Sequence, residues 1–189
     1  MIFNGGIYNS KWNTKKLNEL GDFSRGISKH RPRNDKCLFD GGGYPLIQTS
    51  EIKNANLFIS KHSTEYNARG LRQSKLWPAG TLCITIAANI AETGILSYPM
   101  CFPDSVVGFI SNKEQTTESF MYYIFEYIRN SIQRGSKGSA QDNINLEYLM
   151  ELTFKIPSIE YQEKILSILS TIDNKINLNN CINDNLSYR

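Results

Sequence analysis

Short apolar runs separated by turn-rich loops dominate the first 110 residues of the sequence. Runs of this length, bounded by Gly, Pro, Asn and Asp, are typical of β-strands. We expect strands at Tyr44–Thr49, Thr81–Ala87, Gly94–Ser97 and Val106–Ile110. A loop of unusual length runs from Gly26 to the triple glycine at 41–43, which we interpret as a hinge. Loops of such length are often functional.

The apolar spacing changes to a helical one after residue 116. Between residues 117 and 133 apolar side chains recur every three or four positions, which predicts a helix that ends at Gly135. A short helix at Asn145–Leu152 and a strand at Thr153–Ile156 are expected next. Together these elements predict an α+β fold, with a mixed or antiparallel, β-rich globular domain over residues 1–157.

A long helix is predicted over residues 158–189. Ser158 stands at the N-cap position and Glu160 in the first turn, where a carboxylate favours the helix dipole. Four apolar residues then follow at spacings of four, three and four: Ile165, Leu169, Ile172 and Ile176. So narrow a stripe is typical of a coiled coil, and we expect this arm to pair with a second helix. A terminal helix folded back on its own domain is the alternative.

Composition and charge bound the class of protein. With 189 residues and 40% hydrophobic content, the chain suits one domain with an appendage. No apolar run reaches membrane-spanning length and no signal peptide is recognisable, so we expect a cytoplasmic protein without a membrane partner. Residues 1–80 carry 13 Lys+Arg and 6 Asp+Glu, whereas the remainder carries 8 and 12. The basic half suits phosphates, although solvated lysines give the same count.

Motifs of catalysis and of metal binding are missing from the sequence. There is no P-loop, no dinucleotide-binding glycine motif, no His-Glu-x-x-His and no Gly-x-Ser-x-Gly. The four cysteines are far apart and form no Cys-x-x-Cys pair, so we expect neither a metal, a cofactor nor a disulfide framework. Cys83 or Cys101 could pair with His62 as a nucleophile, but their apolar surroundings favour buried packing residues.

Several segments, in order, resemble the specificity subunits of type I restriction-modification systems. The C-terminal stretch carries most of the resemblance, in Gly138–Ile144, Leu149–Pro157, Gln162–Leu166 and Ile172–Asp173. The family's Glu-Gln pair appears here as Tyr161-Gln162. Upstream, Trp12 with Lys16–Asp22 and Gly26, and then Gly80–Ile84, are similar to the family's domain opening and central strand. Threonine at 81 replaces a common aspartate.

The resemblance implies a half-length specificity subunit with a single target recognition domain and one helical arm. Such a subunit is not itself an enzyme. It binds double-stranded DNA and docks methyltransferase subunits that methylate an adenine, while a motor and endonuclease subunit joins through the complex. Full-length members carry two recognition domains, so the resemblance implies a homodimer through the C-terminal helix. Each copy would then read one half of a bipartite target.

Candidate DNA-binding residues follow from charge and hydrogen-bonding geometry. Phosphate contacts are expected from Lys29, Arg31, Arg33, Lys36, Arg69, Arg72, Lys75, Arg134 and Lys137. Base edges suit Arg72, Gln73 and Asn89, because Arg pairs with guanine and Gln or Asn with adenine. Ser139 and Gln141 are candidates for a contact at the junction, where capping of neighbouring backbone is equally compatible. For each residue a solvated surface is the competing interpretation.

Three other interpretations of the whole chain stay open. It fits a fragment of a full-length specificity subunit, or the recognition domain of a single-chain restriction-methylation enzyme. Both retain DNA reading. The third is a coiled-coil adaptor without a nucleic-acid role.

Overall fold

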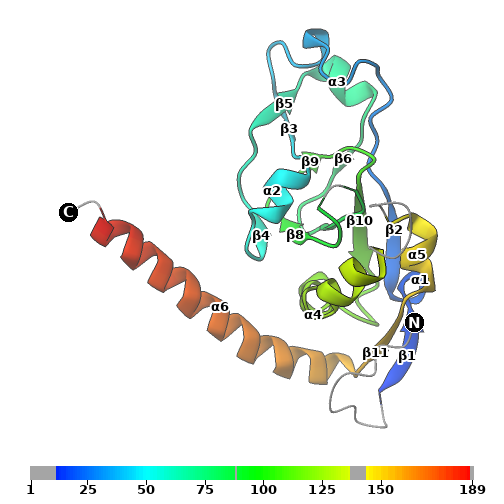
Figure 1. Ribbon diagram of the computed structural model, residues 1–189, viewed down its shortest axis with the longest axis vertical. Helices are drawn as coiled ribbons and strands as arrows, with labels where there is room; N and C mark the ends of the chain where they lie inside the picture. The colour runs from blue at the N-terminus through cyan, green and yellow to red at the C-terminus, as the bar shows by residue number, and fades with distance from the viewer. Residues whose placement is uncertain (1–11, 88, 137–143, 188–189) are drawn as a thin grey trace.

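The computed structural model describes residues 12–87, 89–136 and 144–187 (Figure 1). Its helices are α1 (Leu17–Leu20), the 3-10 turn η1 (Lys36–Leu38), α2 (Thr49–Lys53), α3 (Ala68–Arg72), α4 (Glu118–Ser136), α5 (Leu146–Glu151) and α6 (Ile159–Ser187). Its strands are β1 (Asn13–Lys16), β2 (Gly21–Arg25), β3 (Tyr44–Leu46), β4 (Phe58–Ile59), β5 (Thr64–Tyr66), β6 (Leu76–Trp77), β7 (Leu82–Thr85), β8 (Thr93–Leu96), β9 (Met100–Cys101), β10 (Val106–Ser111) and β11 (Thr153–Ile156).

The strands form three sheets, which confirms the predicted α+β class. A five-stranded sheet has the order β2-β10-β7-β8-β4, and a four-stranded sheet has the order β5-β3-β9-β6. Most neighbours are antiparallel, while β3 with β9 and β4 with β8 are parallel. The third sheet consists of β1 and β11 alone. None of the helices in the described part of the chain combines the length and the apolar content needed to cross a bilayer.

The central strand β7 explains why its sequence is apolar without alternation. It lies between β10 and β8 and is buried along its whole length. Successive side chains of a strand point to opposite faces. Leu82 and Ile84 enter the main core with α4, whereas Cys83 joins a second cluster with Trp77 and Phe102 on the other side of the sheet. Both faces of the sheet are therefore covered.

The segments 27–46 and 64–75 form a smaller unit, which we call the distal lobe. In Figure 1 it occupies the end of the molecule opposite β1 and β11. Its small core consists of Leu38, Leu46 and Tyr66 together with Cys101 of β9, which packs against the lobe. The triple glycine at 41–43 lies here with φ angles of +88°, +57° and +117°, a region of backbone conformation that favours glycine.

The two ends of the globular part are tied together at the base of the arm. Strand β1 pairs with β11 in antiparallel register, Asn13 with Ile156 through to Lys16 with Thr153. Just beyond β11 the side chain of Gln162 is fully buried. It donates to the carbonyl oxygens of Gln115 at 2.9 Å and Pro157 at 3.0 Å, and accepts from the Thr116 hydroxyl at 3.0 Å. These bonds hold the first turn of α6 to the residues before α4 and to the end of β11.

Most predicted elements are present, but β3 and β7 are shorter than expected and β10 extends one residue further. Asn145 caps α5 through the N–H of Tyr148 at 2.8 Å, and α6 begins directly after Ser158. One boundary was wrong, because Gly135 lies inside α4, which continues to Ser136. A single glycine near a helix end costs only about 1 kcal/mol, which the buried face of α4 offsets.

Candidate nucleic-acid interface

The distal lobe gathers seven of the predicted phosphate-binding residues, and all seven side chains are exposed. They are Lys29, Arg31, Arg33, Lys36, Arg69, Arg72 and Lys75. They come from the loop between β2 and β3, from α3 and from the residues after α3. The lobe therefore presents positive charge from segments that lie up to 46 positions apart in the sequence. Such a surface attracts phosphates without regard to base sequence.

Asn67 joins the long loop to α3. Its side-chain oxygen accepts from the backbone N–H groups of Arg69 at 2.9 Å and Gly70 at 3.0 Å, which caps the helix. Its side-chain nitrogen donates to the carbonyl oxygens of Cys37 at 3.1 Å and Asp40 at 2.9 Å. One side chain thus satisfies backbone groups of two segments and fixes the cations of α3 relative to those of the loop.

Gln73 closes the other edge of the lobe. Its side-chain oxygen accepts from the N–H of His30 at 3.0 Å, and its carbonyl oxygen accepts from the N–H of Lys29 at 3.3 Å. Its side-chain nitrogen is buried and has no hydrogen-bond partner among the described residues. Gln73 therefore positions the loop, and base contact by Gln73 stays a prediction that requires its amide to turn outward. Nearby, the Lys75 ammonium lies 3.5 Å from the centre of the Trp77 ring.

The two arginines of the loop already have partners. Arg33 donates to both carboxylate oxygens of Asp104, at 2.8 and 2.9 Å, and both side chains are about half exposed. Arg31 donates to the carbonyl oxygens of Ser28 at 2.6 Å and His30 at 2.8 Å. Exposed ion pairs contribute at most about 1 kcal/mol. A phosphate can therefore compete with Asp104 for Arg33.

Two other candidates lie away from the lobe. Asn89 is half-buried in the turn between β7 and β8, and Arg134 is exposed in the last turns of α4. The two segments touch where Gln133 donates to the carbonyl oxygen of Ile90 at 2.8 Å. Lys137, Ser139 and Gln141 fall outside the described residues. The structure thus divides the candidates between the distal lobe and the end of α4.

One set of potential metal ligands lies in the lobe. His30, Asp35 and Cys37 each offer one ligand atom, and these atoms lie within 4.8 Å of one another. Hydrogen bonds from Cys37, through its side chain and its N–H, and from His30 hold the pKa of Asp35 at about 2. The cysteine spacing in the sequence did not reveal this set, because Asp35 carries no signal alone.

The two cysteines considered as nucleophiles are packing residues. Cys83 and Cys101 are buried, and burial raises the pKa of both thiols. A thiol held in its neutral form is a poor nucleophile. His62 is engaged elsewhere, with the hydroxyl of Tyr98 at 2.6 Å and a carboxylate oxygen of Glu65 at 3.0 Å.

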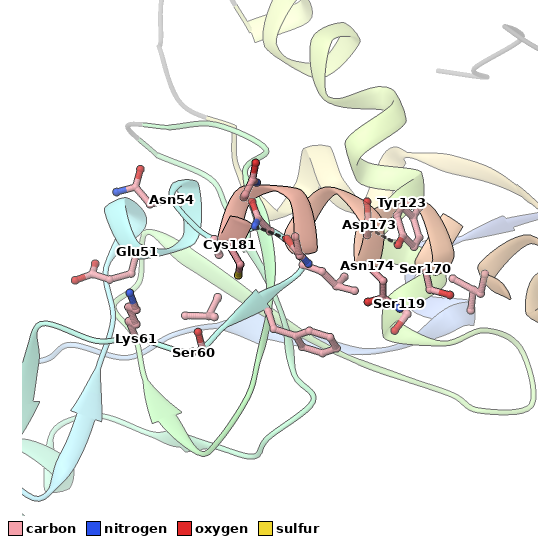
Figure 2. Close-up of a pocket in the computed structure, with 18 of the residues that line it drawn as sticks. Glu51, Asn54, Ser60, Lys61, Ser119, Tyr123, Ser170, Asp173, Asn174 and Cys181 are labelled. Carbon is pink, nitrogen blue, oxygen red and sulfur yellow. Dashed lines mark hydrogen bonds between the residues drawn. The ribbon is translucent and has the colours of Figure 1, made fainter. Parts of the chain in front are cut away.

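The arm α6 turns a polar side toward its own domain. The hydroxyl of Tyr123 donates to Asp173 at 2.5 Å, and the amide of Asn56 donates to Asn177 at 3.0 Å. Burial, and then the hydrogen bond to Asp173, raises the pKa of Tyr123. Between arm and domain runs a groove of about 1100 Å³, shown in Figure 2. Beyond the base of the arm, these two hydrogen bonds join α6 to the domain.

The opposite side of the arm is apolar and uncovered. Four isoleucines along it have exposed fractions of 64, 49, 50 and 46%: Ile168, Ile172, Ile176 and Ile182. We call them the isoleucine face. Of the predicted stripe, Ile172 and Ile176 belong to this face, whereas Ile165 packs against the main core and Leu169 is half-buried. Ile168 and Ile182 were missed by the sequence pattern.

The sequence matches one protein family over nearly its whole length. Residues 9–188 match the type I restriction modification DNA specificity domain. Among curated proteins, the type I restriction enzyme MjaIX specificity subunit of Methanocaldococcus jannaschii is 25% identical over 174 residues, covering 87% of this chain and 38% of the relative. The putative MjaX specificity subunit of the same organism is 26% identical over 163 residues, covering 85% and 37%. The chain thus spans less than half the length of these relatives.

Solved structures share the fold. A chain from a study of assembly and conformational transition of the type I R-M system aligns with a TM-score of 0.73 at 17% identity, covering 93% of this chain and 42% of that one. The HsdS subunit of Thermoanaerobacter tengcongensis aligns with a TM-score of 0.69 at 17% identity, covering 93% and 40%. The S subunit from M. genitalium aligns with a TM-score of 0.61 at 16% identity, covering 91% and 42%.

Proposed function

This chain belongs to the type I restriction modification DNA specificity domain family, and on that premise we propose that it reads DNA sequence for a restriction-modification complex. The match over residues 9–188 is the observation that carries the proposal. The seven exposed cations of the distal lobe supply chemistry that the function needs. Their charge attracts the phosphate backbone, while polar side chains held beside them read base edges.

The chain is proposed to have no catalytic step of its own. Methyltransferase subunits docked beside it would methylate an adenine within the sequence that it selects, and a motor and endonuclease subunit would join through the same complex. Residues 1–157 would read the DNA, and residues 158–189 would pair with another arm and dock the methyltransferase.

The partner of the arm is proposed to be the arm of a second copy. The isoleucine face is supported from behind by polar contacts to the domain, so its apolar side chains remain available. Burying them against an identical face would remove apolar surface from water, which stabilises helix pairs. Two copies would then present two distal lobes to the two halves of a bipartite target.

DNA reading is tested in cells that hold the partner subunits. We expect deletion of this chain to abolish adenine methylation at one bipartite sequence, and re-expression to restore it. Arg69→Glu with Arg72→Glu should fail to restore it, because both side chains are exposed on α3 and the change reverses charge at the lobe. Methylated adenines are mapped across the genome by single-molecule sequencing.

A matched pair of charge reversals serves as the control. Lys53→Glu with Lys61→Glu makes the same change of net charge at exposed sites outside both the distal lobe and the arm, and should restore methylation fully. A methylation map that is the same with and without this chain would contradict DNA reading and leave the coiled-coil adaptor.

Pairing of the arms is tested by sedimentation of the purified chain. Ile172→Lys with Ile176→Lys places two charges on the isoleucine face and should reduce the dimer mass to that of a monomer. Ser167→Lys with Asn174→Lys places the same charges on the groove side of the same helix and should leave the dimer intact. Retention of the dimer in the isoleucine variant would rule out this face as the interface.

A further inference from the structure

Three side chains in the distal lobe have no part in the proposed DNA reading. His30, Asp35 and Cys37 lie within one short stretch of the loop, and all three are half-buried. His30 approaches Asp35 to 2.9 Å between ring nitrogen and carboxylate oxygen. The three potential ligand atoms lie within 4.8 Å of one another.

We propose that His30, Asp35 and Cys37 bind a divalent transition-metal ion, for which Zn²⁺ is the best chemical match. Imidazole nitrogen, carboxylate oxygen and thiolate sulfur are the three donor types that zinc takes in proteins. Bond lengths of about 2.0–2.3 Å in a tetrahedron place neighbouring ligand atoms roughly 3.3–3.6 Å apart. The spacing between His30 and Asp35 is 2.9 Å, and no pair of the three ligand atoms is more than 4.8 Å apart, so modest side-chain rotations reach this geometry. Carboxylate and thiolate together balance the charge of the ion, and water can take the fourth position.

The backbone that carries the three ligands is already held in place. A carboxylate oxygen of Asp35 accepts from the N–H of Cys37 at 3.0 Å, which caps the turn η1. The N–H of His30 donates to Gln73 at 3.0 Å, and the carbonyl oxygen of Cys37 accepts from Asn67 at 3.1 Å. Each ligand therefore sits on a fixed segment, so metal binding requires little further ordering.

A metal-free hydrogen-bonded turn is the competing explanation for this geometry. The molecule contains a useful comparison, because His62 and Glu65 form the same kind of pair, 3.0 Å between ring nitrogen and carboxylate oxygen. Among the described residues, His62 and Glu65 belong to no group of three potential metal ligands, because no third ligand lies close enough to them. A metal at His30 and Cys37 would join both ends of the segment that bears Arg31, Arg33 and Lys36. The site does not depend on the proposed function.

The proposal is tested with untagged, full-length, metal-stripped protein titrated with Co²⁺ and then with Zn²⁺. We expect one equivalent of Co²⁺ to produce a thiolate-to-metal charge-transfer band, which Zn²⁺ abolishes. Cys37→Ser keeps a hydroxyl that can donate to Asp35 but removes the thiolate, so the band should disappear. Both Cys37→Ser and His30→Gln should weaken Zn²⁺ binding by more than about tenfold.

Two variants provide matched controls. His62→Gln changes the comparison pair, and Cys181→Ser removes the exposed cysteine of α6, so both should bind as the wild type does. In the Cys181→Ser protein, Zn²⁺ should also slow alkylation of Cys37 by more than about tenfold. Absence of a stoichiometric Co²⁺ complex, a charge-transfer band that survives Cys37→Ser, or an alkylation rate that ignores Zn²⁺ would overturn the proposal.

Discussion

At the scale of single residues, Asn67 connects segments that lie about 30 positions apart. Asn67→Ala removes the cap of α3 and both bonds to the loop at Cys37 and Asp40. We expect the free energy of unfolding to fall by about 2–3 kcal/mol, because one cap and two hydrogen bonds are removed. Urea denaturation measures the decrease, and amide exchange should rise first in residues 36–40.

Asn54→Ala is the control for that measurement. Asn54 is an exposed asparagine at the end of α2, so its replacement should change stability by less than about 0.5 kcal/mol. Equal decreases in the two variants would mean that the bonds of Asn67 do not hold the lobe together.

Glu118 makes the stability of the domain depend on pH. Burial by itself raises the pKa of Glu118, but hydrogen bonds from Lys113 and from the N–H of Ser111 outweigh burial and leave the pKa below its ordinary value of 4.5. The stabilisation is therefore present above pH 4.5 and is lost as pH falls through the lowered value. Unfolding measured from about pH 6 to about pH 3 should show a weaker acid dependence in Glu118→Gln than in the wild type. If stability falls with pH equally in the two proteins, Glu118 is not the cause of the acid dependence.

Residue roles were only partly predictable from the sequence. Exposed cations can be found by counting, because charged side chains rarely lie in a core. The role of Gln73 could not be found, because it depends on the N–H of His30, 43 residues away. The grouping of Asp35 with Cys37 and His30 likewise arises from a turn that no periodic pattern records.

At the scale of elements, long helices could be predicted from the sequence and very short ones could not. The helices α4 and α6 span several turns, so their apolar periodicity is visible. The short helices α2 and α3 and the turn η1 have three to five residues each, too few to show a period, and none was predicted. The apolar spacing in α6 correctly predicted a stripe of apolar residues. It did not indicate that Ile165, at the start of the stripe, packs against the core of its own domain.

The base of the arm depends on the buried amide of Gln162. Gln162→Leu has a similar size but leaves the carbonyl oxygens of Gln115 and Pro157 and the hydroxyl of Thr116 without their present partner. We expect stability to fall by about 2–4 kcal/mol, since unsatisfied buried polar groups cost about 1–3 kcal/mol each and partly recover by relaxation. Thermal and urea unfolding of Gln162→Leu and of the wild type measure this loss of stability.

The arm should also change its orientation in that variant. Distances between spin labels placed on α4 and on α6 should have a broader distribution in Gln162→Leu than in the wild type, whereas Glu163→Gln, at the exposed neighbouring position, should leave the distribution unchanged. A narrow, unchanged distribution would show that the hydrogen bond between Tyr123 and Asp173 orients the arm instead.

At the scale of the whole molecule, the basic and acidic halves of the sequence occupy different parts of the structure. The distal lobe lies within the basic first 80 residues, while the acidic remainder supplies α4 and the arm. We consider the assembled complex on its target duplex. In Arg69→Glu with Arg72→Glu, the plot of log binding constant against log salt concentration should become less steep by about 2, one for each phosphate that is no longer neutralised. Fluorescence anisotropy at several salt concentrations measures the slope.

The charge reversal outside the lobe is again the comparison. Lys53→Glu with Lys61→Glu should leave the salt slope within about 0.5 of the wild type, since neither residue lies in the distal lobe or in the arm. Equal slopes in all three proteins would mean that DNA binds at the end of α4 or elsewhere.

The pairing of β1 with β11 has a consequence for inheritance. The chain enters and leaves its globular part through one four-residue ladder, next to the root of the arm. Because the two ends of this segment lie side by side, we expect the structure to accept a different segment between β1 and β11 whose ends are equally close. Selection for assembly would then act on the ladder and the arm, while the distal lobe diverges freely. On the proposed function, a single exchange of this segment would change the DNA sequence that the protein selects.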